Sequence, residues 1–178
     1  MNVGIVGAPC SGKTSVLKEL EKGLQHTDII YEFAREYLER FETIKDSTDQ
    51  LYISSMQKYR EEESRRKRRN FITEAPVFVG EVYGIVYFPA KFSTDYKNFD
   101  SDKYQYDKLF LMERLPCFYQ DGVRYQSIKE WKFLDKTLRR AAKHFSPELI
   151  EVPYMSLEDR VAFIKENMGD IDEIKYRT

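Results

Sequence analysis

Residues 3–14 read Val-Gly-Ile-Val-Gly-Ala-Pro-Cys-Ser-Gly-Lys-Thr, and this stretch decides the fold. Its first four residues are a short apolar run, which predicts a buried β-strand. The last eight match the pattern G-x-x-x-x-G-K-[ST] at every fixed position, and an amphipathic helical pattern follows at once. A strand, a glycine-rich loop and a helix in this order predict a loop whose backbone N–H groups bind phosphate.

Each fixed position of this loop has a chemical role. We expect Lys13 to reach the β- and γ-phosphates of ATP, and the Thr14 hydroxyl to bind Mg²⁺. ATP and Mg²⁺ are therefore the predicted cofactors. Cys10 occupies a variable position, so a small filler residue is favoured over a reactive thiol. The other residues expected to contact the nucleotide are Gly7, Ala8, Pro9, Ser11, Gly12 and Ser15.

The rest of the chain alternates between short apolar runs and amphipathic stretches. Further strands are predicted at 28–31, 71–73, 109–112 and 149–152. Further helices are predicted at 33–41, 49–69, 77–88, 128–144 and 157–168. Residues 91–107 and 115–126 read as loops. This alternation predicts an α/β fold, a three-layer sandwich with a parallel sheet and helices on both faces, which places a ligand at the carboxyl ends of the strands.

Two carboxylates follow predicted strands and are candidates for the chemistry. Glu74 comes directly after the strand at 71–73, where a second acid can hold Mg²⁺ through water. Glu32 follows the strand at 28–31, where a carboxylate can face the γ-phosphate and act as a base on an acceptor. Arg35, one turn further on, is a candidate for binding substrate. The alternative for both acids is an ordinary acidic residue at a helix N-terminus.

Two arginines and three aromatic residues complete the candidate site. Arg114 and Arg124 flank a Pro- and Gly-containing loop, and a mobile loop could bring them over the phosphates as a lid at about 114–127. The alternative is two surface arginines. The apolar helix at 77–88 could contact the acceptor, although core packing is the alternative for its aromatic residues. Its candidate substrate-binding residues are Phe78, Tyr83 and Tyr87.

Composition excludes several classes of protein. The 178 residues are 42% hydrophobic, which supports one globular domain over 1–178 and argues against disorder. The formal net charge of −1 argues against a generally basic nucleic-acid-binding protein. Two cysteines cannot build a disulfide framework, and no stretch is apolar enough to span a membrane, so a cytoplasmic protein is expected. The basic run 65–69 follows three glutamates and reads as a solvated helix end, so nucleic acid is not the favoured partner.

Four segments carry a family resemblance. They are the loop at 7–14, residues 32–38 (Glu-Phe-Ala-Arg-Glu-Tyr-Leu), residues 73–76 (Thr-Glu-Ala-Pro), and residues 111–114 (Leu-Met-Glu-Arg) with 121–126 (Asp-Gly-Val-Arg-Tyr-Gln). In combination they resemble P-loop kinase-like ATPases related to the nicotinamide riboside kinase domain of bacterial NAD-salvage regulators, a group that includes phage nucleotide-kinase-like proteins. The resemblance covers about residues 2 to 165.

This resemblance implies a P-loop NTPase fold with a five-stranded sheet in the order 2-3-1-4-5. It implies ATP·Mg²⁺ at Lys13 and Thr14, a metal-site acid at Glu74, a substrate-side role for Glu32 and a lid role for Arg124. Glu74 departs from the group, which usually has Asp there. Because the longer side chain shifts the carboxylate, the departure bears on catalytic efficiency more than on nucleotide binding.

The predicted function is ATP-dependent phosphoryl transfer to a small nucleoside or nucleotide, which makes the chain a kinase. If the acceptor is a nucleoside, Glu32 serves as its base; if it is a monophosphate, Arg35 grips the phosphate. The alternatives are a regulatory nucleotide-binding ATPase, a P-loop protein that binds nucleotide without turnover, and a polynucleotide 5′-end kinase. An intact Lys13 and Thr14 together with a lid arginine favour the enzyme.

Overall fold

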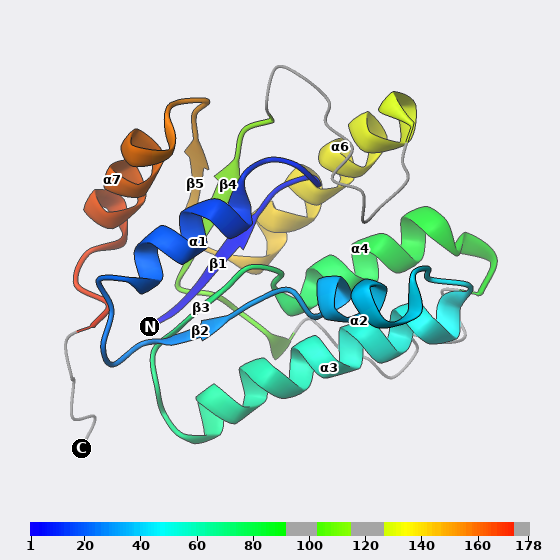
Figure 1. The fold of residues 1–178 in the computed structure, drawn as a ribbon, viewed down its shortest axis with the longest axis horizontal. Helices are drawn as coiled ribbons and strands as arrows, with labels where there is room; N and C mark the ends of the chain where they lie inside the picture. The colour runs from blue at the N-terminus through cyan, green and yellow to red at the C-terminus, as the bar shows by residue number, and fades with distance from the viewer. Residues whose placement is uncertain (92–102, 115–126, 173–178) are drawn as a thin grey trace.

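The centre of the molecule is a five-stranded sheet with every strand parallel (Figure 1). The computed structural model describes residues 1–91, 103–114 and 127–172. Within them the strand order is β2-β3-β1-β4-β5, which confirms the predicted order and fold class. The strands are β1 (Asn2–Val6), β2 (Asp28–Ile30), β3 (Phe71–Thr73), β4 (Lys108–Met112) and β5 (Leu149–Val152).

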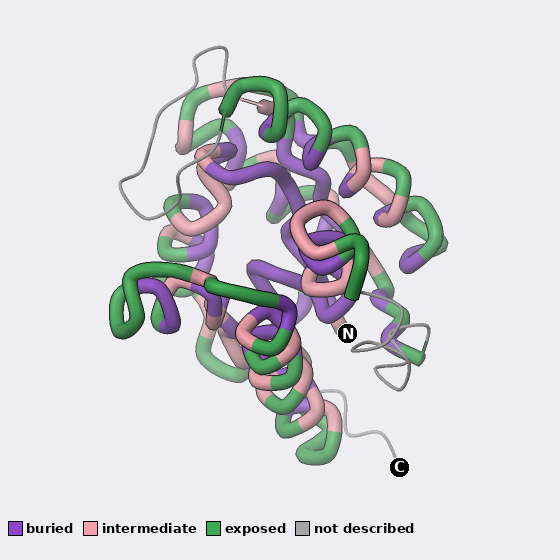
Figure 2. Tube along the Cα trace, turned by 90° about the vertical axis from the view of Figure 1, so that its right-hand side faces the viewer, coloured by how far each residue is buried: buried purple, intermediate pink, exposed green. Residues whose placement is uncertain are grey.

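Helices cover both faces of this sheet and make it the middle of three layers (Figure 1). On one face, α1 (Lys13–Glu21) and α7 (Leu157–Met168) bury their apolar sides against β1. On the other face, α4 (Val77–Tyr87) and α6 (Ile128–Phe145) do the same. The central strands β1, β3 and β4 are mostly buried, whereas β2 and β5 at the edges are partly exposed. Figure 2 shows the buried segments in the interior and the exposed ones on the outer faces of the helices. None of the described helices is long and apolar enough to cross a membrane.

Two further helices among the described residues lie beside the β2 edge of the sheet. Helix α3 (Ser47–Arg66) packs along α4, and α2 (Phe33–Phe41) packs on α3 (Figure 1). The close approach of α3 and α4 requires a glycine, because a Cβ at Gly80 would lie 2.2 Å from Ser54 Oγ. The buried face of α3 is unusual in being mostly polar; its members include Gln50, Ser54, Gln57, Glu61 and Ser64.

The observed elements agree closely with the predicted ones, and the differences have local causes. Helix α3 begins at Ser47 rather than 49 because the Asp46 side chain accepts hydrogen bonds from the backbone N–H groups of Thr48 and Asp49. Phe41, four residues after the buried Tyr37, is 47% exposed because it is the last residue of α2. The predicted loops at 91–107 and 115–126 lie largely outside the described residues.

Part of the first predicted loop belongs to the core. Tyr104 and Tyr106 are buried directly before β4. The Tyr106 hydroxyl donates to Glu61 Oε2 at 2.7 Å and accepts from the backbone N–H of Val77 at 2.8 Å. The polar, tyrosine-rich composition of this stretch gives no sign of burial, because the partners of the Tyr106 hydroxyl lie on α3 and α4, far away in the sequence.

Candidate active site

The phosphate loop lies between β1 and α1, as predicted, and its backbone geometry depends on Gly12. This residue precedes α1 with φ 87°, a left-handed conformation in which side chains are strained. Cys10 is partly exposed and also has a positive φ, of 62°. The Lys13 ammonium donates to the carbonyl oxygens of Gly7 at 3.0 Å and Ala8 at 3.1 Å. Its charge therefore lies across the mouth of the loop, where phosphate would bind.

The two predicted metal-site residues are in direct contact. The Thr14 hydroxyl donates a hydrogen bond to Glu74 Oε1, although 60 residues separate them in the sequence. Glu74 is held by its own backbone N–H, which donates to Ile30 O at 2.9 Å. A hydroxyl and a carboxylate oxygen side by side suit Mg²⁺, because this ion takes oxygen ligands. Few protein ligands are needed when substrate phosphates and water supply the other ligands of the ion. In the part of the chain that the structure describes, no group of three or more His, Cys, Asp or Glu residues is arranged so that it could hold a metal ion.

A hollow of about 450 Å³ lies in front of these groups. Its size falls in the ordinary range for small-molecule sites. The phosphate loop forms one side, and Glu32, Arg35 and Glu74 line the remainder. Lys18 and Glu39, which the sequence did not single out, also line it. The structure thus brings together the predicted phosphate-binding, metal-binding and acceptor-side residues.

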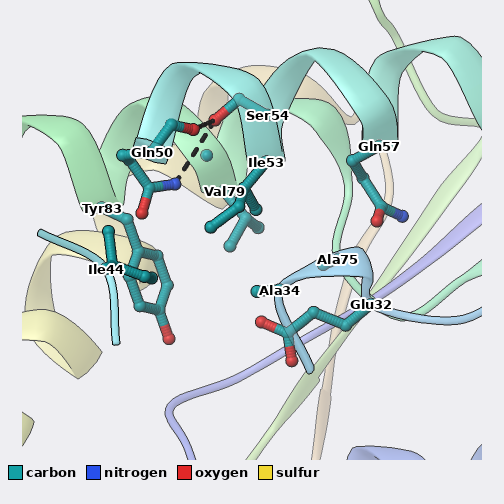
Figure 3. A pocket seen from close by; sticks show the side chains of 11 residues that line it. Glu32, Ala34, Ile44, Gln50, Ile53, Ser54, Gln57, Ala75, Val79 and Tyr83 are labelled. Carbon is teal, nitrogen blue, oxygen red and sulfur yellow. Dashed lines mark hydrogen bonds between the residues drawn. The ribbon is translucent and has the colours of Figure 1, made fainter. Parts of the chain in front are cut away.

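Glu32 also lines a second, smaller pocket of about 30 Å³ (Figure 3). In Figure 3 the carboxylate of Glu32, directly before α2, and the hydroxyl of Tyr83, on α4, point into the same space. The walls are mainly apolar, with the amides of Gln50 and Gln57 as polar additions. A volume of this size holds about one water molecule, so the pocket offers room for one substituent of an acceptor.

The other two aromatic candidates on α4 do not line either pocket. Phe78 is fully buried and stacks on Phe145, with ring centroids 4.4 Å apart and an interplanar angle of 4°. Its predicted contact with substrate is therefore corrected to core packing, the alternative given above. Tyr87 packs against Tyr83, with ring centroids 5.7 Å apart, and contributes to the same core.

Arg114 reaches the phosphate loop through Trp131. Its guanidinium lies over the Trp131 ring, 5.2 Å from the centroid, and Nε lies 3.4 Å from Asp135 Oδ2. The indole N–H of Trp131 donates to Pro9 O at 2.9 Å. Arg114 thus lies beside the loop, but it lines a groove on the α6 side and not the hollow in front of the loop. Its contact with nucleotide stays a prediction. Arg124 and most of the predicted lid lie outside the described residues.

Arg160 supports the loop from behind, and sequence reasoning missed it. Its Nη1 donates to Ser11 O at 2.7 Å, and its side chain is 3% exposed. Burial lowers the pKa of this guanidinium below its ordinary value. A Cβ on Gly12 would lie 3.3 Å from Nη1, so Gly12 also makes room for this contact. No local pattern marks Arg160, which lies 149 residues after Ser11 and meets it only in the folded chain.

Gln57 links the two candidate carboxylates, and sequence reasoning missed it too. Its Oε1 accepts from Phe33 N at 3.0 Å, and its Nε2 donates to Thr73 Oγ1 at 3.1 Å. Phe33 directly follows Glu32, and Thr73 directly precedes Glu74. One buried amide on α3 therefore connects the start of α2 with the carboxyl end of β3. The sequence gives no specific signal for Gln57, because other residues on the buried face of α3, such as Gln50 and Ser54, are polar too.

The family of the chain follows from comparison with known sequences. A family described as "AAA domain" matches residues 2–160. The chain belongs to this AAA-domain family. No curated protein matches the sequence.

Solved structures share the fold at low sequence identity. The NadR protein in complex with NR superposes with a TM-score of 0.72 and 18% identity, covering 98% of this chain and 54% of that one. Deoxyadenosine kinase from M. mycoides with bound dATP superposes with a TM-score of 0.70 and 15% identity, covering 94% of this chain and 98% of that one. Thymidylate kinase from Candida albicans superposes with a TM-score of 0.61 and 12% identity, covering 97% of this chain and 93% of that one. The expected resemblance to P-loop kinases is confirmed at the level of the fold.

Proposed function

We propose that this AAA-domain protein transfers the γ-phosphoryl group of ATP to a small nucleoside or nucleotide acceptor. The observation that carries the proposal is the place of Glu32, which lines both the hollow beside the phosphate loop and the small pocket next to it. A carboxylate there has access to a phosphate donor on one side and to an acceptor on the other. The structural neighbours that bind deoxynucleotides or NR support the same class of acceptor.

The chain's own residues divide the work of transfer. The loop N–H groups and Lys13 hold the β- and γ-phosphates, and Lys13 leaves the carbonyls of Gly7 and Ala8 to do so. Thr14 and Glu74 would hold Mg²⁺, which supplies charge neutralisation for the phosphates. Glu32 accepts the proton of an acceptor hydroxyl, and Arg35 pairs with an acceptor phosphate when the acceptor is a monophosphate.

The structure favours a small acceptor over the 5′ end of a polynucleotide at this site. Most of the basic run 65–69, the stretch that could have guided a polynucleotide, is paired internally. Arg66 lies 3.7 Å from Glu62, Lys67 2.6 Å from Glu63, and Arg69 3.0 Å from Asp28. The neighbouring carboxylates largely cancel the positive charge of this run, so it offers little net attraction to a polynucleotide.

The test is transfer of radiolabelled γ-phosphate to nucleosides, nucleoside monophosphates, nicotinamide riboside and a DNA oligonucleotide with a free 5′ end. We expect one small acceptor to be labelled and to accelerate ATP consumption. Glu32→Gln should slow transfer to a nucleoside by at least about tenfold, because general-base catalysis contributes roughly 10²–10⁴. Glu39→Gln, a change in the same hollow, is the control. ATP hydrolysis that no acceptor accelerates would instead support a regulatory ATPase.

A further inference from the structure

A strongly basic groove lies on α6, away from the acceptor side of the molecule. It encloses about 520 Å³, and its described lining residues are all charged, with Asp135 the one acid among them. Lys132, Lys136, Arg140 and Lys143 form a strip along the exposed face of the helix. Helix α6 packs over the β4 side of the sheet, whereas Glu32 and Arg35 follow β2 at the opposite edge. The groove and the hollow beside the phosphate loop share no lining residue, although Trp131 on the same helix contacts Pro9 of that loop.

These four cations have no acidic partner in the part of the chain that the structure describes. Asp135 is shared by Arg114 and Arg139, and Arg139 also pairs with Glu151 at 3.2 Å. Within the described residues, Lys132, Lys136, Arg140 and Lys143 form no ion pair or hydrogen bond. Like charges four residues apart repel one another on a helix. This arrangement works against the stability of the free helix, and a bound polyanion would relieve it.

The spacing of the strip fits a chain of phosphates better than a single nucleotide. An α-helix rises 1.5 Å per residue, so these side chains follow one another at about 4.5–6 Å along a strip of roughly 16 Å. Phosphates of a nucleic-acid strand repeat at a comparable distance, at least about 3.4 Å apart along the axis. A mononucleotide would reach only part of the strip.

The composition of the lining also distinguishes nucleic acid from a protein partner. Protein interfaces generally have an apolar or aromatic centre that carries most of the binding energy. Among the described residues, no aromatic or aliphatic side chain lines this groove, so it lacks such a centre. Binding to a phosphate backbone, in contrast, needs only an array of lysines and arginines. We infer that the α6 groove binds the phosphate backbone of a nucleic-acid strand, independently of phosphoryl transfer.

The test is the binding of a fluorescein-labelled 20-nucleotide single-stranded DNA, followed by anisotropy over 50–200 mM salt without ATP. Four phosphate contacts predict a slope of log K against log[salt] of about −2.8, which weakens binding roughly 50-fold over this range. The double variant Lys136→Ala/Arg140→Ala should reduce the magnitude of the slope by about 1.4. The matched control Arg66→Ala/Lys67→Ala removes two charges that already have acidic partners, and should leave the affinity and slope unchanged.

Two further measurements separate the α6 groove from the phosphate loop and from a lipid-binding surface. Lys13→Ala should bind the oligonucleotide as well as the wild type does, so failure of the proposed kinase activity would not affect this result. Four outcomes would each overturn the inference: no salt-dependent binding; equal losses in the two double variants; loss of binding in Lys13→Ala; or binding of phosphatidylserine vesicles, but not DNA, that depends on Lys136 and Arg140. Thermal melts of every variant verify that the fold is retained.

Discussion

The Lys13 ammonium already has two hydrogen-bond partners, the carbonyls of Gly7 and Ala8. Nucleotide binding exchanges these neutral acceptors for phosphate oxygens, and charge-assisted hydrogen bonds are roughly twice as strong as neutral ones. The exchange favours the bound state only when the β- and γ-phosphates are present. Lys13 should therefore make the protein bind ATP more tightly than adenine nucleotides that lack these phosphates.

We predict that Lys13→Ala abolishes most of the thermal stabilisation by ATP·Mg²⁺. A ligand at about 100 times its Kd adds roughly 2.7 kcal/mol to the free energy of unfolding of the wild type. Differential scanning fluorimetry measures the corresponding rise in Tm. The control is Lys22→Ala, which removes an exposed lysine just after α1 that pairs only with Glu19 among the described residues. Equal rises in Tm for the wild type and Lys13→Ala would contradict the assignment of the phosphate loop.

A second prediction concerns the carboxylate in contact with Thr14. Glu74→Gln removes the charge with little change in volume, so Mg²⁺-dependent turnover should fall by two orders of magnitude or more while the fold is retained. Glu74→Asp restores a carboxylate and should keep measurable activity. Turnover measured against Mg²⁺ concentration distinguishes the two variants. Normal turnover by Glu74→Gln would place the metal-site acid elsewhere.

At the scale of elements, Gln57 makes α3 part of the site although the helix contributes no predicted catalytic group. Its amide connects Phe33, the first residue of α2, to Thr73, the last residue of β3. A displacement of about 1 Å in a catalytic group can lower the rate by about 100-fold. The packing of α3 therefore determines the distance between the two carboxylates next to these residues, Glu32 and Glu74.

We predict that Gln57→Ala lowers kcat about tenfold or more, with a smaller change in the KM for ATP. The loss of two buried hydrogen bonds also lowers the free energy of unfolding by roughly 1–3 kcal/mol. Ser64→Ala is the matched control, because Ser64 lies on the same face of α3 but bonds Asp28 at the start of β2. It should lower stability and leave kcat unchanged. Equal effects of Gln57→Ala and Ser64→Ala on kcat would show that Gln57 has only a structural role.

At the scale of the whole molecule, one buried acid joins three elements. Glu61 on α3 accepts from Tyr106 before β4, and Tyr106 in turn accepts from the first residue of α4. Burial raises the pKa of Glu61 to about 7, and the Tyr106 hydrogen bond and the Arg65 charge only partly oppose this shift. The folded protein therefore holds a proton on Glu61 at pH values where the unfolded chain has lost it.

This difference predicts how stability depends on pH. The unfolded-state pKa of Glu is about 4.3, so the folded state binds more protons between pH 4.3 and 7. The stability contributed by Glu61 is fully present below pH 4.3 and is lost as pH rises through about 7, by on the order of 3 kcal/mol. Urea denaturation at a series of pH values should show this fall in wild type and not in Glu61→Gln. Glu63→Gln, which removes an exposed carboxylate, should behave like wild type.

The sequence predicted the architecture well because the phosphate loop and the apolar periodicities are local signals. The helix Phe33–Phe41 and the strands Phe71–Thr73 and Leu149–Val152 have the predicted bounds. Long-range polar contacts could not be predicted in this way. Three side chains form hydrogen bonds with residues that are remote in the chain: Gln57, Arg160 and Tyr106. The residues next to them in the sequence give no indication of these partners. The role of Phe78 could not be decided from the sequence, because the apolar helix α4 contributes side chains both to the core and to a pocket.

The chain has a single tryptophan, and its position beside the phosphate loop makes it an intrinsic optical reporter. Indole emission responds to the polarity around the ring and to its hydrogen bond, and in Trp131 both involve groups that flank the nucleotide site. The loop carbonyl of Pro9 accepts the indole N–H, and the Arg114 guanidinium covers the ring. Nucleotide binding that moves either group should therefore change the emission of the unlabelled wild-type protein. Stopped-flow mixing could then time the rearrangement of the loop without any added dye.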